Sequence, residues 1–176
     1  MTFTQFIAAV VVGLVPSIMW LIFWLHEDAS HSEPRWMLVL CFCAGMIATL
    51  LCVPLEQWLQ GYAHTESMKY TLWAVAEELV KFIAVAAVAL HTRWNEEPID
   101  AMIYCIAVAL GFAALENTLF VMNPMTHGGA LAVSIIHGNL RSVGATLVHV
   151  VSSATIGFAL GFNFYHGRIA KACAWI

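Results

Sequence analysis

A small group of ionisable side chains stands inside apolar stretches of this 176-residue sequence. They are Glu77, Glu78, Lys81, Glu116 and His149. Placing a charged side chain at the centre of a membrane costs roughly 2.5–3.5 kcal/mol on insertion scales. Residues kept at that cost line a reactive site, an ion path or a polar contact between helices.

The first three of these residues share one stretch. On a helix, Glu77 and Lys81 are four residues apart and share a face, while Glu78 and Lys81 are three apart. Lys81 can therefore pair with either glutamate and orient it, but it cannot neutralise both.

Two later stretches carry polar partners. Glu116 is followed by Asn117, and the last stretch holds Arg141, His149 and Ser153. His149 and Ser153 are four residues apart, and Arg141 lies about two turns away on a similar face. Each stretch therefore offers one polar helix face.

The ionisable residues of the three stretches lie at a similar predicted depth in the membrane. If successive helices alternate in direction, Glu77, Glu116 and His149 all lie roughly 9–12 Å below the same membrane side, at 1.5 Å per residue. We therefore expect them to meet in one buried site. Its carboxylates outnumber its ammonium group, so the site must hold protons, water or a cation.

Such a group suits amide hydrolysis. Glu77 would act as general base, and Glu116 would hold the same water. His149, assisted by Asn117 or Ser153, would donate a hydrogen bond to the developing oxyanion or to the leaving group.

Supporting roles are expected for the neighbouring charges. Glu78 and Lys81 would set the charge and orientation of the catalytic pair. Arg141 would anchor the substrate or a helix end. Asp100 is interpreted as the N-cap of the fourth helix.

Three alternatives stay open. Glu77, Glu116 and His149 could hold a divalent metal such as zinc, although the HExxH spacing is absent. The chain could be an ion- or proton-coupled transporter or channel, which also uses intramembrane carboxylates. The polar groups could also simply join helices.

The rest of the sequence predicts the elements that position these residues. It is 61% hydrophobic and 10% charged, with a mean hydropathy of +0.82, whereas soluble domains are about 25% charged. We expect one all-α domain over residues 1–176, a polytopic transmembrane bundle. Its spans, each near the 20 residues that a membrane requires, are predicted at residues 3–25, 36–55, 70–90, 101–122 and 141–164.

Three further features refine this picture. Residues 128–136 are apolar but too short to cross, so a short re-entrant or interfacial helix is predicted there. Gly157 and Gly161 form a GxxxG pair suited to close helix packing. The cysteines lack zinc-type spacing and are expected as reduced, packed thiols.

The distribution of basic residues indicates the orientation of the chain in the membrane and argues against a nucleic-acid partner. Arg35, Arg93, Arg168 and Lys171 fall on one side of the predicted topology and Lys69 and Arg141 on the other, which favours an outer N-terminus and an inner C-terminus. No basic run suits nucleic acid.

Several ordered motifs resemble the PrsW family of intramembrane proteases, relatives of the CAAX prenyl protease and Abi superfamily. The EExxK motif of that family matches residues 77–81, its GFAxxEN block matches residues 111–117, and its last helix resembles Arg141, His149 and Gly157. The resemblance covers nearly the whole chain.

The resemblance implies a multi-span protease of the bacterial inner membrane. Its substrate would be a membrane protein, single-span and similar to an anti-sigma factor, cut near the outer face. Superfamily relatives use a glutamate-activated water, while the PrsW group has also been treated as metallopeptidases. A glutamic and a metal-dependent mechanism both remain open.

Overall fold

Helices form the whole architecture of the part that the structure, a computed structural model, describes. It describes the backbone of residues 2–27, 33–126 and 131–173, and the side chains of residues 2–23, 33–124 and 141–163. The predicted all-α bundle is confirmed. Its elements are α1 (Phe3–Glu27), α2 (Arg35–Gln60), α3 (Glu66–Val85), a π-helical turn η1 (Ala86–Leu90), α4 (Pro98–Thr126) and α5 (Leu131–Cys173).

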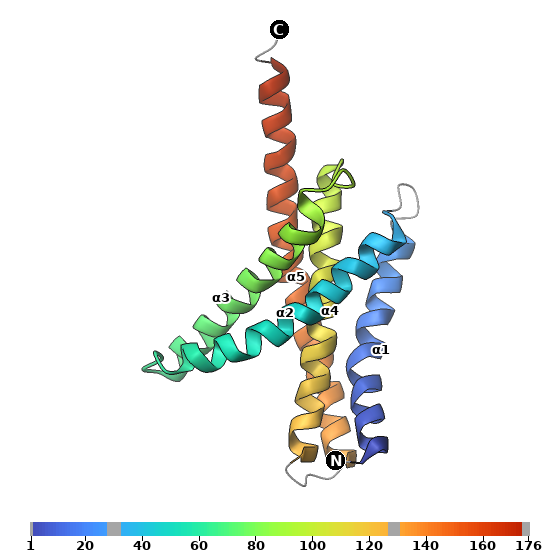
Figure 1. The fold of residues 1–176 in the computed structure, drawn as a ribbon, viewed down its shortest axis with the longest axis vertical. Coiled ribbons are helices and arrows are strands. Elements are labelled where there is room, and N and C mark those ends of the chain that lie inside the picture. Colours follow the sequence, from blue (N-terminus) through green and yellow to red (C-terminus); the bar gives the residue numbers. More distant parts are fainter. Residues whose placement is uncertain (1, 28–32, 127–130, 174–176) are drawn as a thin grey trace.

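The helices form two groups. α1, α4 and α5 run side by side along the long axis of the molecule (Figure 1). α2 crosses α4 obliquely and continues into α3, so that α2 and α3 form a hairpin whose tip spreads away from the other helices (Figure 1). α3 returns towards α4 and α5 at its C-terminal end, and this return brings its charges to the bundle.

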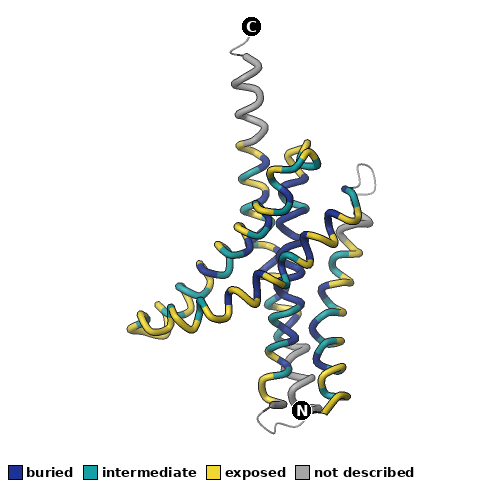
Figure 2. The backbone as a smooth tube through the Cα atoms, viewed as in Figure 1, coloured by how far each residue is buried: buried dark blue, intermediate teal, exposed yellow. Residues whose placement is uncertain are grey.

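α4 is the core of the fold. Its residues are buried on every side from Tyr104 to Ala114, as the dark blue segment of Figure 2 shows. A helix that is apolar all round lies inside a bundle, with other helices covering each face. α1, α2 and α5 all pack against α4 here.

Small residues let the helix backbones approach α4 closely. A Cβ atom added at Gly111 would lie 1.9 Å from the carbonyl oxygen of Phe42 on α2. One added at Gly161 on α5 would lie 1.9 Å from the carbonyl oxygen of Pro98, and one at Gly157 would lie 2.5 Å from Met102 Cα. The GxxxG pair therefore packs against α4 as predicted.

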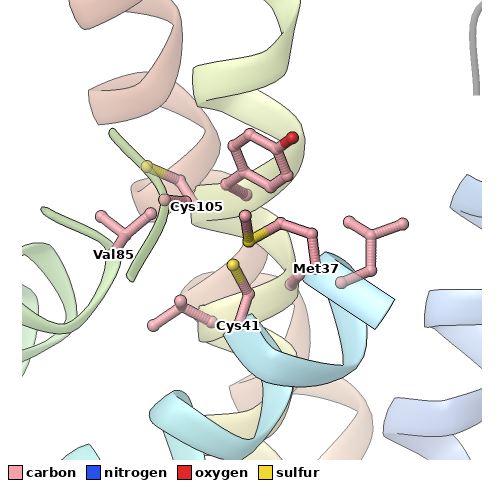
Figure 3. Close-up of a cluster of buried hydrophobic side chains, with 9 residues drawn as sticks. Met37, Cys41, Val85 and Cys105 are labelled. Atoms are coloured by element: carbon pink, nitrogen blue, oxygen red, sulfur yellow. The ribbon is translucent and has the colours of Figure 1, made fainter. Parts of the chain in front are cut away.

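A buried apolar cluster fixes the end of α3 against α2 and α4. Met37 and Cys41 of α2, Val85 at the end of α3 and Cys105 of α4 lie together in it (Figure 3). The thiols of Cys41, Cys52 and Cys105 are free and buried, and Cys43 is free and exposed. The prediction of packed thiols is confirmed for Cys41, Cys52 and Cys105 and is wrong for Cys43, which α2 turns away from the core.

Five spans were predicted, but within the described part of the chain four helices are long and apolar enough to cross a membrane: α1, α2, α4 and α5. α3 with η1 covers the predicted span at residues 70–90, but the charges of α3 lower its hydropathy. In the structure α3 packs mainly against α2.

Two sequence predictions were wrong in detail. Residues 131–136 open α5 rather than forming a separate short helix, because no proline interrupts the chain between them and Arg141; residues 128–130 lie outside the described part. Asp100 is not the N-cap of α4, which begins at Pro98. Its carboxylate reaches back to the backbone N–H groups of Glu96 and Glu97, at 2.8 and 2.7 Å. Asp100 is the third residue of the helix, where an acidic side chain can accept from the N-cap backbone N–H, and Pro98 is the first.

Candidate active site

α3 contributes a buried ion pair to the site. Thr65 caps this helix by accepting a hydrogen bond from the Met68 backbone N–H, and its last turns carry Lys81 towards α5. Lys81 Nζ donates to Glu78 Oε1 at 2.6 Å, and the Lys81 side chain is only 2% exposed. The sequence left open which glutamate pairs with Lys81; the structure selects Glu78.

α5 faces this pair with one polar stripe. Ser142, Thr146, His149 and Ser153 recur at helical spacing and are all buried. Ser153 Oγ donates to Glu78 Oε2 at 3.1 Å, and Ser152 Oγ donates to Glu78 Oε1 at 2.8 Å. Glu78 is thus held by one ammonium and two hydroxyl groups.

The hydrogen bonds of His149 define its tautomer. Its Nδ1 lies 2.9 Å from Lys81 Nζ, and its Nε2 lies 2.7 Å from Glu116 Oε2. An ammonium group can only donate, so Nδ1 accepts and Nε2 carries the ring hydrogen. His149 therefore links the charges of α3 to those of α4 through a neutral ring.

Glu116 on α4 has partners on both oxygens. Arg141 Nη2 donates to Oε1 at 2.6 Å, while His149 donates to Oε2. Arg141 also donates to Asn117 Oδ1 at 3.2 Å, and Asn117 Nδ2 donates to Thr146 Oγ1 at 3.2 Å. Asn117 therefore positions Arg141 and α5.

Glu77 differs from the other two glutamates. Its Oε2 lies 3.7 Å from His149 Nδ1, and its side chain is 20% exposed. Among the side chains that the structure describes, Glu78 is paired with Lys81 and Glu116 with Arg141, but Glu77 forms no ion pair with a lysine or arginine.

The ring of Phe112 separates the network from the packed core. Lys81 Nζ lies 4.8 Å from its centroid, and the His149 ring lies 5.3 Å from it. The backbone carbonyl of Phe112 accepts from Thr49 of α2 at 3.1 Å. The position of α2 is thereby tied to the site.

One residue of the site was missed by the sequence analysis. Glu56 lies on α2, and its half-buried carboxyl interacts electrostatically with Glu77 and Glu116. Hydropathy falls near Glu56, so the sequence placed it in a connection, whereas α2 continues to Gln60. Its spacing from the buried Thr49 and Cys52 is that of one helix face, a signal that could have found it.

Every predicted site residue thus joins one network. A family model described as "PrsW family intramembrane metalloprotease" matches residues 33–176. The chain belongs to the PrsW family. Its membership agrees with the resemblance drawn from the EExxK and GFAxxEN motifs.

Curated PrsW relatives match at low identity over most of the chain. Protease PrsW of Clostridioides difficile (strain 630) is 25% identical over 156 residues, which cover 85% of this chain and 63% of the relative. Protease PrsW of Bacillus subtilis (strain 168) is 26% identical over 162 residues, covering 88% and 68%. The chain therefore spans about two thirds of the length of its PrsW relatives. No solved structure matches it.

The PrsW family description includes a metal, but the arrangement of the predicted ligands does not fit one. A metal would require a lone pair from His149 together with carboxylates converging on one point. Both ring nitrogens of His149 are already hydrogen-bonded, to Lys81 and to Glu116. Within the described part of the chain, no three His, Cys, Asp or Glu side chains are arranged to hold a metal ion. No step is therefore derived through a metal.

Proposed function

We propose that this chain hydrolyses a peptide bond of a membrane-protein substrate, using a water molecule activated by Glu77. The observation that carries the assignment is the pairing of the three glutamates. Lys81 compensates Glu78 and Arg141 compensates Glu116, whereas Glu77 lacks such a cation among the described side chains. A general base must be free to take a proton.

The reaction follows from that assignment. Glu77 takes one proton from the water while the water oxygen bonds to the peptide carbonyl carbon. The electron pair of the C=O bond moves onto the carbonyl oxygen. The C–N bond then breaks as Glu77 returns the proton to the leaving nitrogen. The products are a carboxyl group and an amine.

The ammonium of Lys81, which lies against the same ring nitrogen of His149 as Glu77 does, stabilises the oxyanion. Lys81 Nζ and the His149 ring lie together at 2.9 Å, and His149 is next to Glu77. A charge held in place in a dry site stabilises a developing anion far better than it would in water. Glu116 and Arg141 fix the orientation of His149, while Ser153 fixes Glu78.

The substrate we propose is a single-span membrane protein similar to an anti-sigma factor. The relatives named Protease PrsW support proteolysis, and the apolar helices support a multi-pass location. We further infer the bacterial inner membrane, with the N-terminus outside and the C-terminus inside. The beginning of α1 lies at one end of the molecule and the end of α5 at the other (Figure 1).

Glu77→Gln tests the proposed hydrolysis. In liposomes holding the chain and a single-span anti-sigma-factor substrate, we expect this isosteric variant to lose cleavage while its thermal unfolding is unchanged. Glu66→Gln is the matched control, because Glu66 lies on the same helix with a side chain that is 73% exposed.

Two results would contradict the proposal. Cleavage by Glu77→Gln at the rate of Glu66→Gln would remove Glu77 as the base. Ion flux that depends on Glu116, without any peptide product, would instead support transport. A chelator added to the same assay distinguishes the metal-dependent reaction, which would stop, from the glutamate mechanism, which would continue.

A further inference from the structure

An open groove runs along α3 and ends at the candidate active site. It has a volume of about 690 Å³ and is lined by Ser67, Tyr70, Thr71, Ala74, Val75 and Glu78. These residues recur at helical spacing on one face of α3, whereas Trp73, which holds α3 against α2, lies on another. Towards the tip of the α2–α3 hairpin, α3 diverges from α4 and α5 (Figure 1). The groove therefore follows α3 where this helix leaves the bundle.

The carboxylates at the inner end of the groove make lipid a poor occupant. The side chains of Glu77, Glu78 and Glu116 are 20%, 25% and 25% exposed. Ionisable side chains within a membrane almost always face protein or a water-filled cavity, because lipid tails cannot solvate them. Glu78 borders the groove and also accepts from Ser152 of α5 at 2.8 Å. The groove is thus continuous with the site that has to admit water and a peptide bond.

The hydroxyl groups of the groove suit an unwound peptide backbone. Thr71 Oγ1 donates to the Ser67 backbone carbonyl at 2.9 Å, and a hydroxyl oxygen can also accept hydrogen bonds. A substrate segment that presents a peptide bond to Glu77 has to leave the helical conformation locally, which frees its backbone N–H and C=O groups. Within a membrane, such groups are tolerated only where protein or water satisfies them. The exposed hydroxyls of Ser67, Tyr70 and Thr71 can meet that need.

We propose that this α3 groove binds the unwound segment of the membrane-protein substrate beside the bond to be cut, with Thr71 Oγ1 accepting from a backbone N–H of that segment. The inference rests on the proposed hydrolysis and deepens it by naming where the substrate lies. Ala74 and Val75, between Thr71 and Glu78, present a small and an apolar side chain to the substrate side chains. The segment then runs along α3 from Ser67 to the carboxylates of the site.

Photo-crosslinking in liposomes tests which molecule occupies the groove. The full chain with Glu77→Gln, which keeps the substrate uncleaved, carries a photoreactive amino acid at Val75 or, as a control, at Leu51 of α2. These positions are 61% and 62% exposed, but Leu51 lies outside the groove. With a single-span anti-sigma-factor substrate, we expect adducts to the substrate from Val75 and adducts to lipid alone from Leu51. Lipid adducts alone from both positions, or equal substrate adducts from both, overturn the proposal.

Cleavage by the wild-type chain in the same liposomes separates this inference from the proposed function. Substrate adducts from Val75 without any wild-type cleavage would refute the hydrolysis and leave the groove as a binding site. Cleavage without such adducts would refute the groove and leave the hydrolysis standing.

The Thr71 hydroxyl is tested by the kinetics of cleavage. Thr71→Val keeps the shape of the side chain and should lower kcat/KM by about fivefold, the scale of one hydrogen bond between neutral groups. The loss should appear in KM, because the hydroxyl binds a part of the substrate away from the reacting atoms, and Thr71→Ser should retain the wild-type value. Thr155→Val is the matched control: Thr155 is also exposed and donates to the backbone carbonyl four residues earlier, but on α5 and outside the groove. Equal kcat/KM values for Thr71→Val and Thr155→Val overturn the role of Thr71.

Discussion

Lys81 offers the most demanding test of the charge network. Its side chain is 2% exposed, and its ammonium binds Glu78 at 2.6 Å and His149 at 2.9 Å. Lys81→Met keeps a long side chain but removes the charge, which leaves the Glu78 carboxylate without its cation. Removing one member of a buried pair costs about 3–5 kcal/mol, because the remaining charge stays buried.

The same helix contains a matched control. Lys69 and Glu66 form an ion pair with the same three-residue spacing, at 2.9 Å, but the Glu66 side chain is 73% exposed. Water compensates the charges of such a pair when it is broken. Lys69→Met should therefore leave the free energy of unfolding within the error of the measurement.

Reversible unfolding in mixed micelles, followed by tryptophan fluorescence, measures both variants. We expect Lys81→Met to unfold about 3–5 kcal/mol more easily than the wild type. Adding Glu78→Gln to Lys81→Met should recover more than about 1 kcal/mol, within the usual range for residues in contact. A Lys81→Met chain as stable as Lys69→Met would refute this reasoning, as would a double variant no more stable than Lys81→Met.

Two further variants test the close packing of α2 against α4 and the two hydrogen bonds that the Arg141 guanidinium donates. Gly111→Ala should lower the free energy of unfolding by about 1–3 kcal/mol, because its Cβ would meet the Phe42 backbone at 1.9 Å. Gly144→Ala is the control, because its Cβ would meet nothing within 4 Å, and it should leave that free energy unchanged. Equal free energies of unfolding for the two variants would contradict the close α2–α4 approach. Arg141→Lys cannot donate to Glu116 and Asn117 at once, as the Arg141 guanidinium does. It should slow cleavage by about tenfold, the equivalent of one lost charge-assisted hydrogen bond. An unchanged rate would remove Arg141 from the positioning of Glu116.

The sequence by itself determined the class of fold and most members of the site. Long apolar stretches cannot leave backbone groups unpaired in lipid, so they must be helices. Charges inside such stretches are costly enough that they must find one another. Glu77, Glu116 and His149 could therefore be assigned to one site, and the EExxK and GFAxxEN motifs gave the PrsW family.

Only the tertiary structure decided which of these groups pair. Lys81 could reach either glutamate on an isolated helix, and the choice of Glu78 depends on Ser152, Ser153 and His149 of α5. The choice follows from the rotation of α3 against α5. That rotation is set by packing, which hydropathy does not record.

Glu56 shows the same limit most clearly. Its sequence context is the polar end of an apolar stretch, and nothing in that context relates it to Glu77. Glu56 comes within electrostatic range of Glu77 because α2 crosses α4 where Gly45 and Gly111 let the backbones touch, and because Trp73 holds α3 against α2. The sequence thus determined that charges are buried together, while the close contacts of the helices determined which charges form ion pairs.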